Sequence, residues 1–123
     1  MSFIAGERYT RKQVFAAYGI ESHNISQTHR HLMRSMVTLG TDTWIFMTRG
    51  AYEDDCQIPI PGGFYFVWVV DSGRKIEPAI GLHLHVMVRN HAGAPFVYAG
   101  ISTPAMGPFP VGTGDVALHF SVI

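Results

Sequence analysis

Residues 80–89 read IGLHLHVMVR, and this stretch decides the fold class. Apolar side chains occupy every second position, at Ile80, Leu82, Leu84, Val86 and Val88. Because successive side chains of a β-strand point to opposite faces of its sheet, this alternation indicates a strand with one face on a core. The other face carries His83, His85 and Arg89 among its residues. The stretch therefore predicts a β-rich protein with polar groups on one sheet face.

Further strands are predicted on both sides of this stretch. Residues 64–70 read FYFVWVV, and such a β-branched and aromatic run favours a strand covered on both faces. Residues 43–48, 95–102 and 116–122 are also predicted as strands, with residues 90–94 as a hairpin loop. Residues 106–112 read MGPFPVG, and we expect no regular element there because Pro and Gly interleave.

A short helix is predicted near the N-terminus. Thr10 and Gln13 have the spacing of a capping box, and Gly19 suits the position after a helix end. Residues 24–40 fit two interpretations: a helix ending at Gly40, or a polar loop over 21–30 and a strand near 31–38. Together the elements predict an α+β fold. It would be a small, partly open β-barrel of five or more mainly antiparallel strands, with one or two short N-terminal helices.

Composition limits the classes of protein to consider. The chain has 123 residues, of which 47% are hydrophobic and 15% charged, and we expect one domain over residues 1–123. Its single cysteine excludes an intrachain disulfide and favours a reducing compartment. There is no apolar run of membrane-spanning length and no signal-peptide pattern at Met1. We therefore expect a cytoplasmic protein without a membrane partner.

The charges are balanced overall but unevenly distributed. Nine Lys and Arg residues match nine Asp and Glu residues, which argues against a nonspecific nucleic-acid binder. Six of those basic residues and three of the acidic ones lie within residues 1–50, so the first part of the chain is basic. A basic face beside an acidic remainder leaves a polyanionic partner as one interpretation, and chance in small counts is the other.

Three histidines form the first candidate site. His83 and His85 share a strand face, and His119 lies on another predicted strand. If those strands were neighbours, the three imidazoles would form a transition-metal site. The alternative is that they form hydrogen bonds on a polar face. We favour the second interpretation and expect neither a metal nor another cofactor.

Residues 52–56, YEDDC, form the second candidate site. Paired acids bind Mg²⁺ or hydrogen-bond the edge of a base, although they also occur in solvated loops. Acids beside Cys56 disfavour its thiolate, so we do not expect a nucleophile there. We find no other catalytic arrangement, and we do not expect the chain to be an enzyme on its own.

Several segments, taken in order, resemble a known family. Residues 6–11 read GERYTR before the helix, and they are followed by WIF at 44–46, YEDD at 52–55, FYFVW at 64–68, HVMVR at 85–89 and PFVYAG at 95–100. This order is similar to that of SRA-like domains. Those are PUA-like β-barrels of modification-dependent restriction endonucleases and related defence proteins. The family's glycine-rich, Trp-containing loop is absent, with residues 22–36 in its place, and so is the usual nuclease domain.

The resemblance implies a protein that binds duplex DNA and flips a modified base into a barrel pocket. On this interpretation Trp68 is a stacking wall. We place the following residues at the base pocket: Tyr52, Asp54, Asp55, Trp68, His83 and His85. We place the following residues on the DNA backbone: Arg11, Lys12, Arg30, His31, Arg34, Arg49 and Arg89.

The predicted function is a non-catalytic reader of modified double-stranded DNA that works with a nuclease or effector partner. One alternative is a small-molecule- or metal-binding β-barrel, enzymatic or not, that uses His83, His85 and His119. Another is a homo-oligomeric or partner-binding module, because low surface charge and many aromatic residues suit a protein interface.

Overall fold

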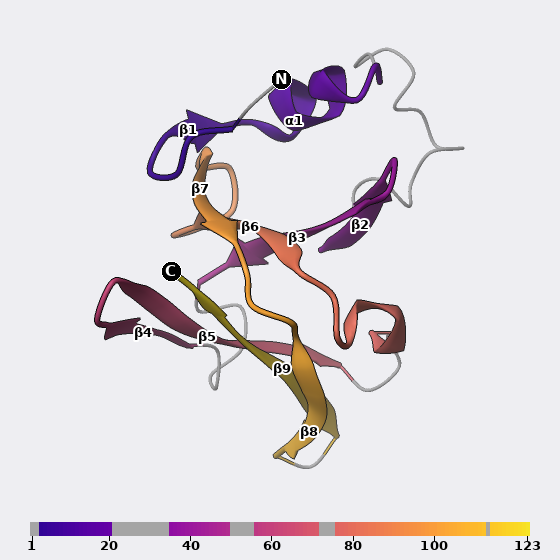
Figure 1. Ribbon diagram of the computed structural model, residues 1–123, viewed down its shortest axis with the longest axis vertical. Helices are drawn as coiled ribbons and strands as arrows, with labels where there is room; N and C mark the ends of the chain where they lie inside the picture. Colours follow the sequence, from indigo (N-terminus) through magenta and orange to yellow (C-terminus); the bar gives the residue numbers. More distant parts are fainter. Residues whose placement is uncertain (1–2, 21–34, 50–55, 72–75, 113) are drawn as a thin grey trace.

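The computed structural model describes residues 3–20, 35–49, 56–71, 76–112 and 114–123, and the statements below refer to them. The chain forms two β-sheets and little helix, as expected for a small β-rich fold (Figure 1). The five-stranded sheet consists, in spatial order, of β1 (Arg8–Tyr9), β7 (Phe96–Ile101), β6 (Leu84–Arg89), β3 (Asp42–Thr48) and β2 (Met36–Leu39). The four-stranded sheet consists of β4 (Cys56–Ile60), β5 (Gly63–Asp71), β9 (Asp115–Val122) and β8 (Met106–Val111). The helical elements are α1 (Arg11–Ala17) and the 3-10 turn η3 (Glu77–Ala79).

The five-stranded sheet contains a parallel pair, β3 and β6, among antiparallel neighbours. The pairing runs from Thr43 opposite Leu84 to Thr48 opposite Arg89, so both strands end at the same edge. The backbone continues this contact, because the amide of Arg49 donates to the carbonyl of Arg89 at 2.8 Å. Arg49 and Arg89, far apart in the sequence, therefore lie side by side at the ends of these two strands.

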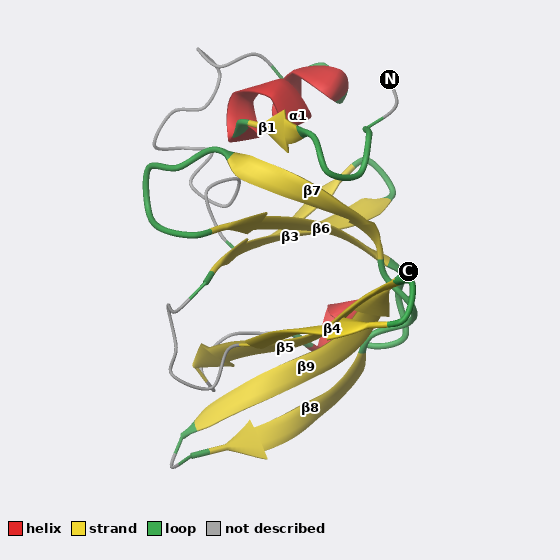
Figure 2. Ribbon diagram, turned by 90° about the vertical axis from the view of Figure 1, so that its left-hand side faces the viewer, coloured by secondary structure: helices red, strands yellow, loops and turns green. Residues whose placement is uncertain are grey.

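Figure 2 shows α1 on one side of the five-stranded sheet and the four-stranded sheet on the other. A hydrophobic core lies on each of these two faces. Leu84, Val86 and Val88 face the four-stranded sheet and form a core with its inner face. Met87 and its neighbours on the other face pack under α1, with Phe15 of the helix. The inward face of residues 84–88 is as the alternation predicted, but the opposite face, expected to be polar, is covered at Met87 by the second core. The strand begins only at Leu84, whereas Ile80 forms an isolated bridge with Ala105.

The two sheets are joined at one corner. Ser102, directly after β7, forms a bridge with Val122 of β9. Thr103 continues the contact, since its amide donates to the carbonyl of Ser121 at 2.7 Å. The hydroxyl of Ser102 is buried and accepts from the amide of Leu84 at 2.8 Å, which ties the corner to β6. The result is a barrel-like arrangement of two sheets.

The N-terminal helix forms as the sequence predicts. Thr10 is its N-cap: the Thr10 hydroxyl accepts from the Gln13 amide at 3.2 Å, and the Gln13 side chain accepts from the Thr10 amide at 2.8 Å. These two bonds satisfy amides that the first helical turn leaves without partners. Gly19 follows the helix with a φ of 77°, a conformation that favours glycine. None of the described helices is long and apolar enough to cross a membrane.

Three expectations about local structure need correction. A helix running to Gly40 is wrong, because Met36–Leu39 is strand β2 and supports the loop-and-strand interpretation; residues 21–34 lie outside the described residues. Residues 106–111 do form a strand, β8, which tolerates its prolines because it lies at a sheet edge where missing amide donors cost little. Coverage of β5 on both faces is incomplete, since Phe64 is 39% exposed.

Candidate functional site: a basic cleft between the sheets

A cavity of about 960 Å³ lies between the end of the β6–β7 hairpin and the β4–β5 hairpin. Its volume is typical of a ligand pocket. Three arginines line it, Arg8, Arg49 and Arg89, together with His91. Among the described residues, no acidic side chain lines the cavity. We call this cavity the inter-sheet cleft, and its charge suits an anionic partner.

Arg49 crosses from one sheet to the other at this cleft. One guanidinium nitrogen, Nη1, donates to Oδ1 of Asn90 at 2.9 Å. The other, Nη2, donates to Oε1 of Gln57 on β4. Both amide oxygens accept hydrogen bonds from Arg49. The NH₂ groups of Asn90 and Gln57 therefore point away from the guanidinium and can donate hydrogen bonds to another partner. The cleft therefore has two oriented amides beside a fixed positive charge.

Arg89 and Arg11 are held on aromatic rings beside the cleft. The Arg89 guanidinium lies 4.5 Å from the centre of the Phe96 ring, and its Nε donates to the Thr48 hydroxyl at 2.8 Å. Arg11, on α1, lies 4.2 Å from the centre of the Phe46 ring. Burial, together with the charge of Arg89, lowers the pKa of Arg11 to about 10, so this guanidinium is still charged at neutral pH. Aromatic contacts of this kind fix the position of a cation while keeping its charge.

The walls of the cleft are apolar. Phe64 and Val97 line it with 39% and 36% of their surfaces exposed. Ala99 and Val122 complete this surface. An exposed aromatic ring beside cationic groups offers a stacking surface for a planar ligand. Phe64 is therefore an exposed ring at the inter-sheet cleft.

The structure places the other predicted pocket residues differently. Trp68 is 4% exposed within the inter-sheet core and lines neither the inter-sheet cleft nor the second cavity described below. His83 is exposed ahead of β6, with Nδ1 hydrogen-bonded to the carbonyl oxygen of Ser102 at 2.8 Å. A stacking role for Trp68 is therefore wrong, because its ring is enclosed by the core. Tyr52, Asp54 and Asp55 lie outside the described residues and stay predictions.

Of the residues predicted to contact the DNA backbone, some line the inter-sheet cleft and others do not. Arg49 and Arg89 line the inter-sheet cleft. Lys12 is exposed on α1 and does not line it. Arg30, His31 and Arg34 lie outside the described residues. The polar lining residues that were not predicted from the sequence are Arg8, Gln57, Asn90 and His91. They share no local motif, since strand pairing alone brings them together.

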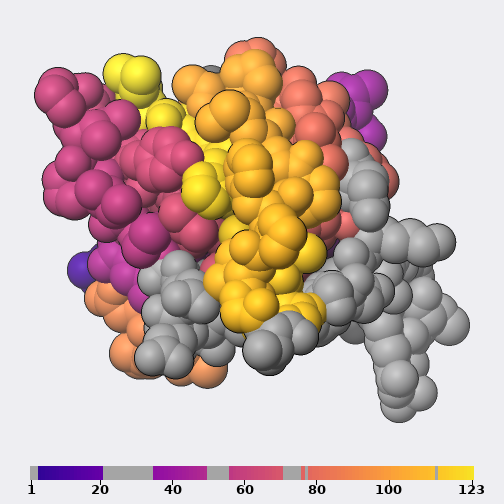
Figure 3. All heavy atoms as spheres, turned by 90° about the horizontal axis from the view of Figure 1, so that it is seen from below, coloured from indigo at the N-terminus to yellow at the C-terminus, as the bar shows by residue number. Residues whose placement is uncertain are grey.

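The three-histidine metal site is wrong. His85 faces α1 on the five-stranded sheet, whereas His119 lies on the outer face of the four-stranded sheet, which Figure 3 shows from below. His119 is hydrogen-bonded to the Tyr65 hydroxyl at 2.6 Å and packs against Phe109. The part of the chain that the structure describes contains no group of three His, Cys, Asp or Glu residues able to hold a metal.

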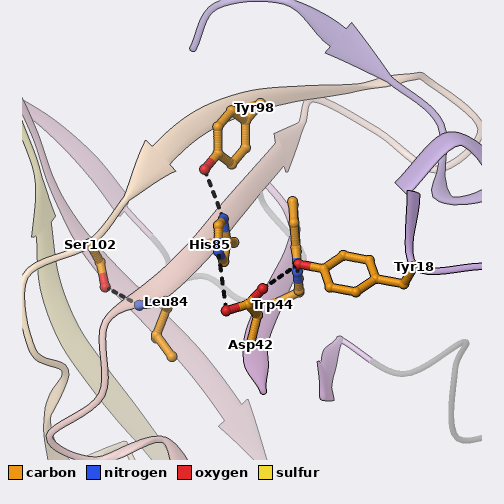
Figure 4. A network of polar contacts seen from close by, with 7 residues as sticks. All are labelled: Tyr18, Asp42, Trp44, Leu84, His85, Tyr98 and Ser102. Atoms are coloured by element: carbon orange, nitrogen blue, oxygen red, sulfur yellow. Dashed lines mark hydrogen bonds and ion pairs between the residues drawn. The ribbon is translucent and has the colours of Figure 1, made fainter. Parts of the chain in front are cut away.

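His85 belongs to a polar cluster under α1 (Figure 4). Its Nδ1 lies 2.8 Å from the Tyr98 hydroxyl, and its Nε2 lies 3.9 Å from Oδ1 of Asp42. The Tyr18 hydroxyl donates to Oδ2 of Asp42 at 2.6 Å and accepts from Nε1 of Trp44 at 2.9 Å. Figure 4 shows the Tyr98, His85 and Asp42 side chains arranged in one line of contacts. We call these five residues the Asp42 cluster.

Burial controls the protonation of the Asp42 cluster. It raises the pKa of Tyr18 to about 12, assisted by the hydrogen bond to Asp42. It also raises the pKa of Tyr98 to about 12, assisted by the Asp42 charge. It lowers the pKa of His85 below its ordinary value of 6.5, and this effect outweighs the opposing influence of Asp42. At neutral pH the two phenols and the imidazole are therefore uncharged.

Comparison with known proteins gives no relative. The chain matches no protein-family model, and neither a curated protein nor a solved structure shows significant similarity to it. The resemblance to SRA-like domains stays a prediction from the sequence.

Proposed function

We propose that this chain is a non-catalytic reader of modified double-stranded DNA, with the inter-sheet cleft as its base pocket. One observation carries the proposal: a ligand-sized cleft that combines three arginines with apolar walls and an exposed phenyl ring. A nucleotide has the same combination of properties, because its phosphate is anionic and its base is flat and largely apolar on its faces.

Each part of the cleft has a role in this proposal. Arg8, Arg49 and Arg89 contact phosphates and position the duplex. Phe64 stacks on the base that is flipped out of the helix. The NH₂ group of Gln57, oriented by Arg49, hydrogen-bonds an edge of that base and supplies discrimination.

The predicted pocket residues Tyr52, Asp54 and Asp55 remain part of the proposal. In the sequence they lie between Arg49 and Cys56, the first residue of β4. Their carboxylates would accept hydrogen bonds from exocyclic amino groups of a base. Cleavage is not assigned to this chain, and a nuclease or effector partner would supply it.

A binding panel tests the proposal. Duplexes of one sequence, each with a single modified base, are titrated by fluorescence anisotropy against the unmodified duplex at two salt concentrations. We expect one modification to bind more tightly than the unmodified duplex, by up to about tenfold, because a single hydrogen bond from the Gln57 NH₂ group is worth about 0.5–1.5 kcal/mol. Equal affinity across the panel would contradict a reader.

Variants separate phosphate contacts from base contacts. Arg89→Ala should weaken binding to all duplexes alike and reduce the slope of log affinity against log salt by about one. Gln57→Ala should leave that slope unchanged and remove the preference for the modified base. Lys12→Ala removes the same charge from the exposed face of α1 and is the matched control. A loss equal to that of Arg89→Ala in this control would place the duplex on α1 instead of the cleft.

A further inference from the structure

A second cavity, of about 400 Å³, lies between α1 and the five-stranded sheet. The residues around it are Phe3, Ala17, Tyr18, Asp42, His85, Tyr98 and Ile101. Tyr98 lines both cavities, whereas the other residues around this one do not line the inter-sheet cleft. We call it the α1 cavity. Its lining differs from that of the cleft, because it combines a carboxylate with aromatic rings.

Most polar groups around the α1 cavity already have hydrogen-bond partners within the protein. The Tyr18 hydroxyl has used its proton on Asp42 and accepts from Trp44. The Tyr98 hydroxyl is bonded to Nδ1 of His85. We assign the imidazole proton to Nε2, because this tautomer turns an N–H toward Oδ1 of Asp42 and the other would turn a lone pair toward it.

The separation of 3.9 Å between Nε2 and Oδ1 is too long for a direct hydrogen bond. Oδ1 of Asp42 therefore keeps acceptor capacity toward the cavity. Asp42 is half-buried, so part of its carboxylate is accessible. His85 has no lone pair left for a proton in this arrangement, which argues against a general base.

The charge of the α1 cavity favours a cation. Asp42 is the one acidic side chain among its described lining residues, and no lysine or arginine is among them. The phenols of Tyr18 and Tyr98 and the imidazole of His85 are neutral at pH 7, as described above. Aromatic side chains around a carboxylate favour an organic cation, since ring faces attract positive charge and ring surfaces bury hydrocarbon.

We propose that the α1 cavity binds a small organic ammonium ion, whose N–H donates to Oδ1 of Asp42 and whose hydrocarbon part packs against Phe3, Tyr98 and Ile101. This proposal does not rest on the proposed DNA-reading function, because none of the residues given a DNA contact there lines the α1 cavity. The recognised feature is an ammonium group on an apolar body.

Benzylamine and benzyl alcohol are a matched pair of probes, since they have nearly the same shape and differ in charge. Titration calorimetry with the full chain at pH 7.5 (roughly one unit above the ordinary His pKa) measures both affinities. We expect benzylamine to bind about tenfold more tightly or better, as charge-assisted hydrogen bonds are the stronger class. Asp42→Asn should abolish this preference, because the amide still accepts from Tyr18 but has no charge. Asp115→Asn, at the far end of β9, removes the same charge elsewhere and should keep the preference.

A second variant, Ile101→Lys, tests the proposal in case Asp42→Asn does not fold. Ile101 is 54% exposed at the cavity, so Ile101→Lys adds a positive charge without disturbing a core. It should weaken benzylamine about tenfold while leaving benzyl alcohol nearly unchanged. Ile58→Lys, at a 48% exposed position on the four-stranded sheet, is its control. Failure of benzylamine to bind, equal affinity for both probes, or a preference that survives both Asp42→Asn and Ile101→Lys would each overturn the proposal.

Discussion

The imidazole of His85 lies flat on the indole of Trp44, with ring centres 4.3 Å apart and planes 12° from parallel. Trp44 is fully buried, so it shields one face of the imidazole from water. Burial disfavours the charged form of histidine, and the pKa of His85 falls below 6.5 although Asp42 opposes the shift. The stacking contact therefore links a packing feature to a dependence of stability on pH.

Acid should destabilise the protein partly through His85. Because the pKa is lower in the folded state than in the unfolded state, the unfolded state takes up the proton first as pH falls. The contribution of His85 is fully present above pH 6.5 and is lost as pH falls from there through the folded-state pKa. Urea denaturation at pH 8 and at pH 5, on either side of the ordinary His pKa of about 6.5, measures the free energy of unfolding. Its decrease between the two pH values should be smaller for His85→Gln than for the wild type. His91→Gln, in an exposed loop, is the control and should follow the wild type. Parallel curves for His85→Gln and the wild type would refute this link.

Tyr18 and Tyr98 should ionise at a higher pH than an ordinary tyrosine. Both have a pKa near 12, because burial and Asp42 disfavour a second negative charge beside the carboxylate. A folded-state pKa above the ordinary value of 10 gives stability that is present below pH 10 and is lost as pH rises toward 12. Ultraviolet absorbance of tyrosinate should show a late step, which Tyr18→Phe and Tyr98→Phe each reduce. Complete titration of the folded protein near pH 10 would be inconsistent with a buried Asp42 cluster.

The β4–β5 hairpin should be sensitive to one methyl group. A Cβ added at Gly63 would lie 1.9 Å from the carbonyl oxygen of Val122, which is backbone and cannot turn aside. Gly63→Ala should therefore lower the free energy of unfolding by about 1–3 kcal/mol or more. Gly114→Ala is the matched control, since nothing lies within 4 Å of its added Cβ, and it should change stability by less than about 0.5 kcal/mol. Chemical denaturation of the two variants compares them, and equal stabilities would mean that β5 and β9 approach less closely here.

Local features were predictable because their causes are local. The capping box of Thr10 and Gln13 needs only neighbouring residues, and the alternation of residues 84–89 shows which side chains share a face. The β8 strand was missed because Pro and Gly argue against strands in general, whereas an edge strand tolerates them. Residues 36–39 also fitted a helical period, and pairing with β3 decides in favour of a strand.

The candidate site was less predictable because it depends on which strands become neighbours. Arg49 and Arg89 meet through the parallel pairing of β3 and β6, a relationship that neither segment encodes alone. Alternation separated His85 from the inward-facing Leu84 and Val86, but it could not show that His85 lies under α1 while His119 lies on the outer face of the other sheet. Likewise, aromatic content marked Phe64 and Trp68 equally, and only the packing of the sheets buries one and exposes the other.

Replacing Arg49 by lysine should separate its charge from its geometry. The guanidinium fork binds Asn90 and Gln57 at the same time, and so fixes both amides across the two sheets. Lysine keeps the charge but is a flexible point donor that cannot hold two acceptors in a fixed plane. Under the proposed function, Arg49→Lys should therefore keep the salt dependence of DNA binding and lose most of the preference for the modified base. Arg49→Ala should lose both, with the slope reduced by about one. Anisotropy titrations with the same duplex panel measure the two quantities, and an unchanged preference in Arg49→Lys would show that the oriented amides do not read the base.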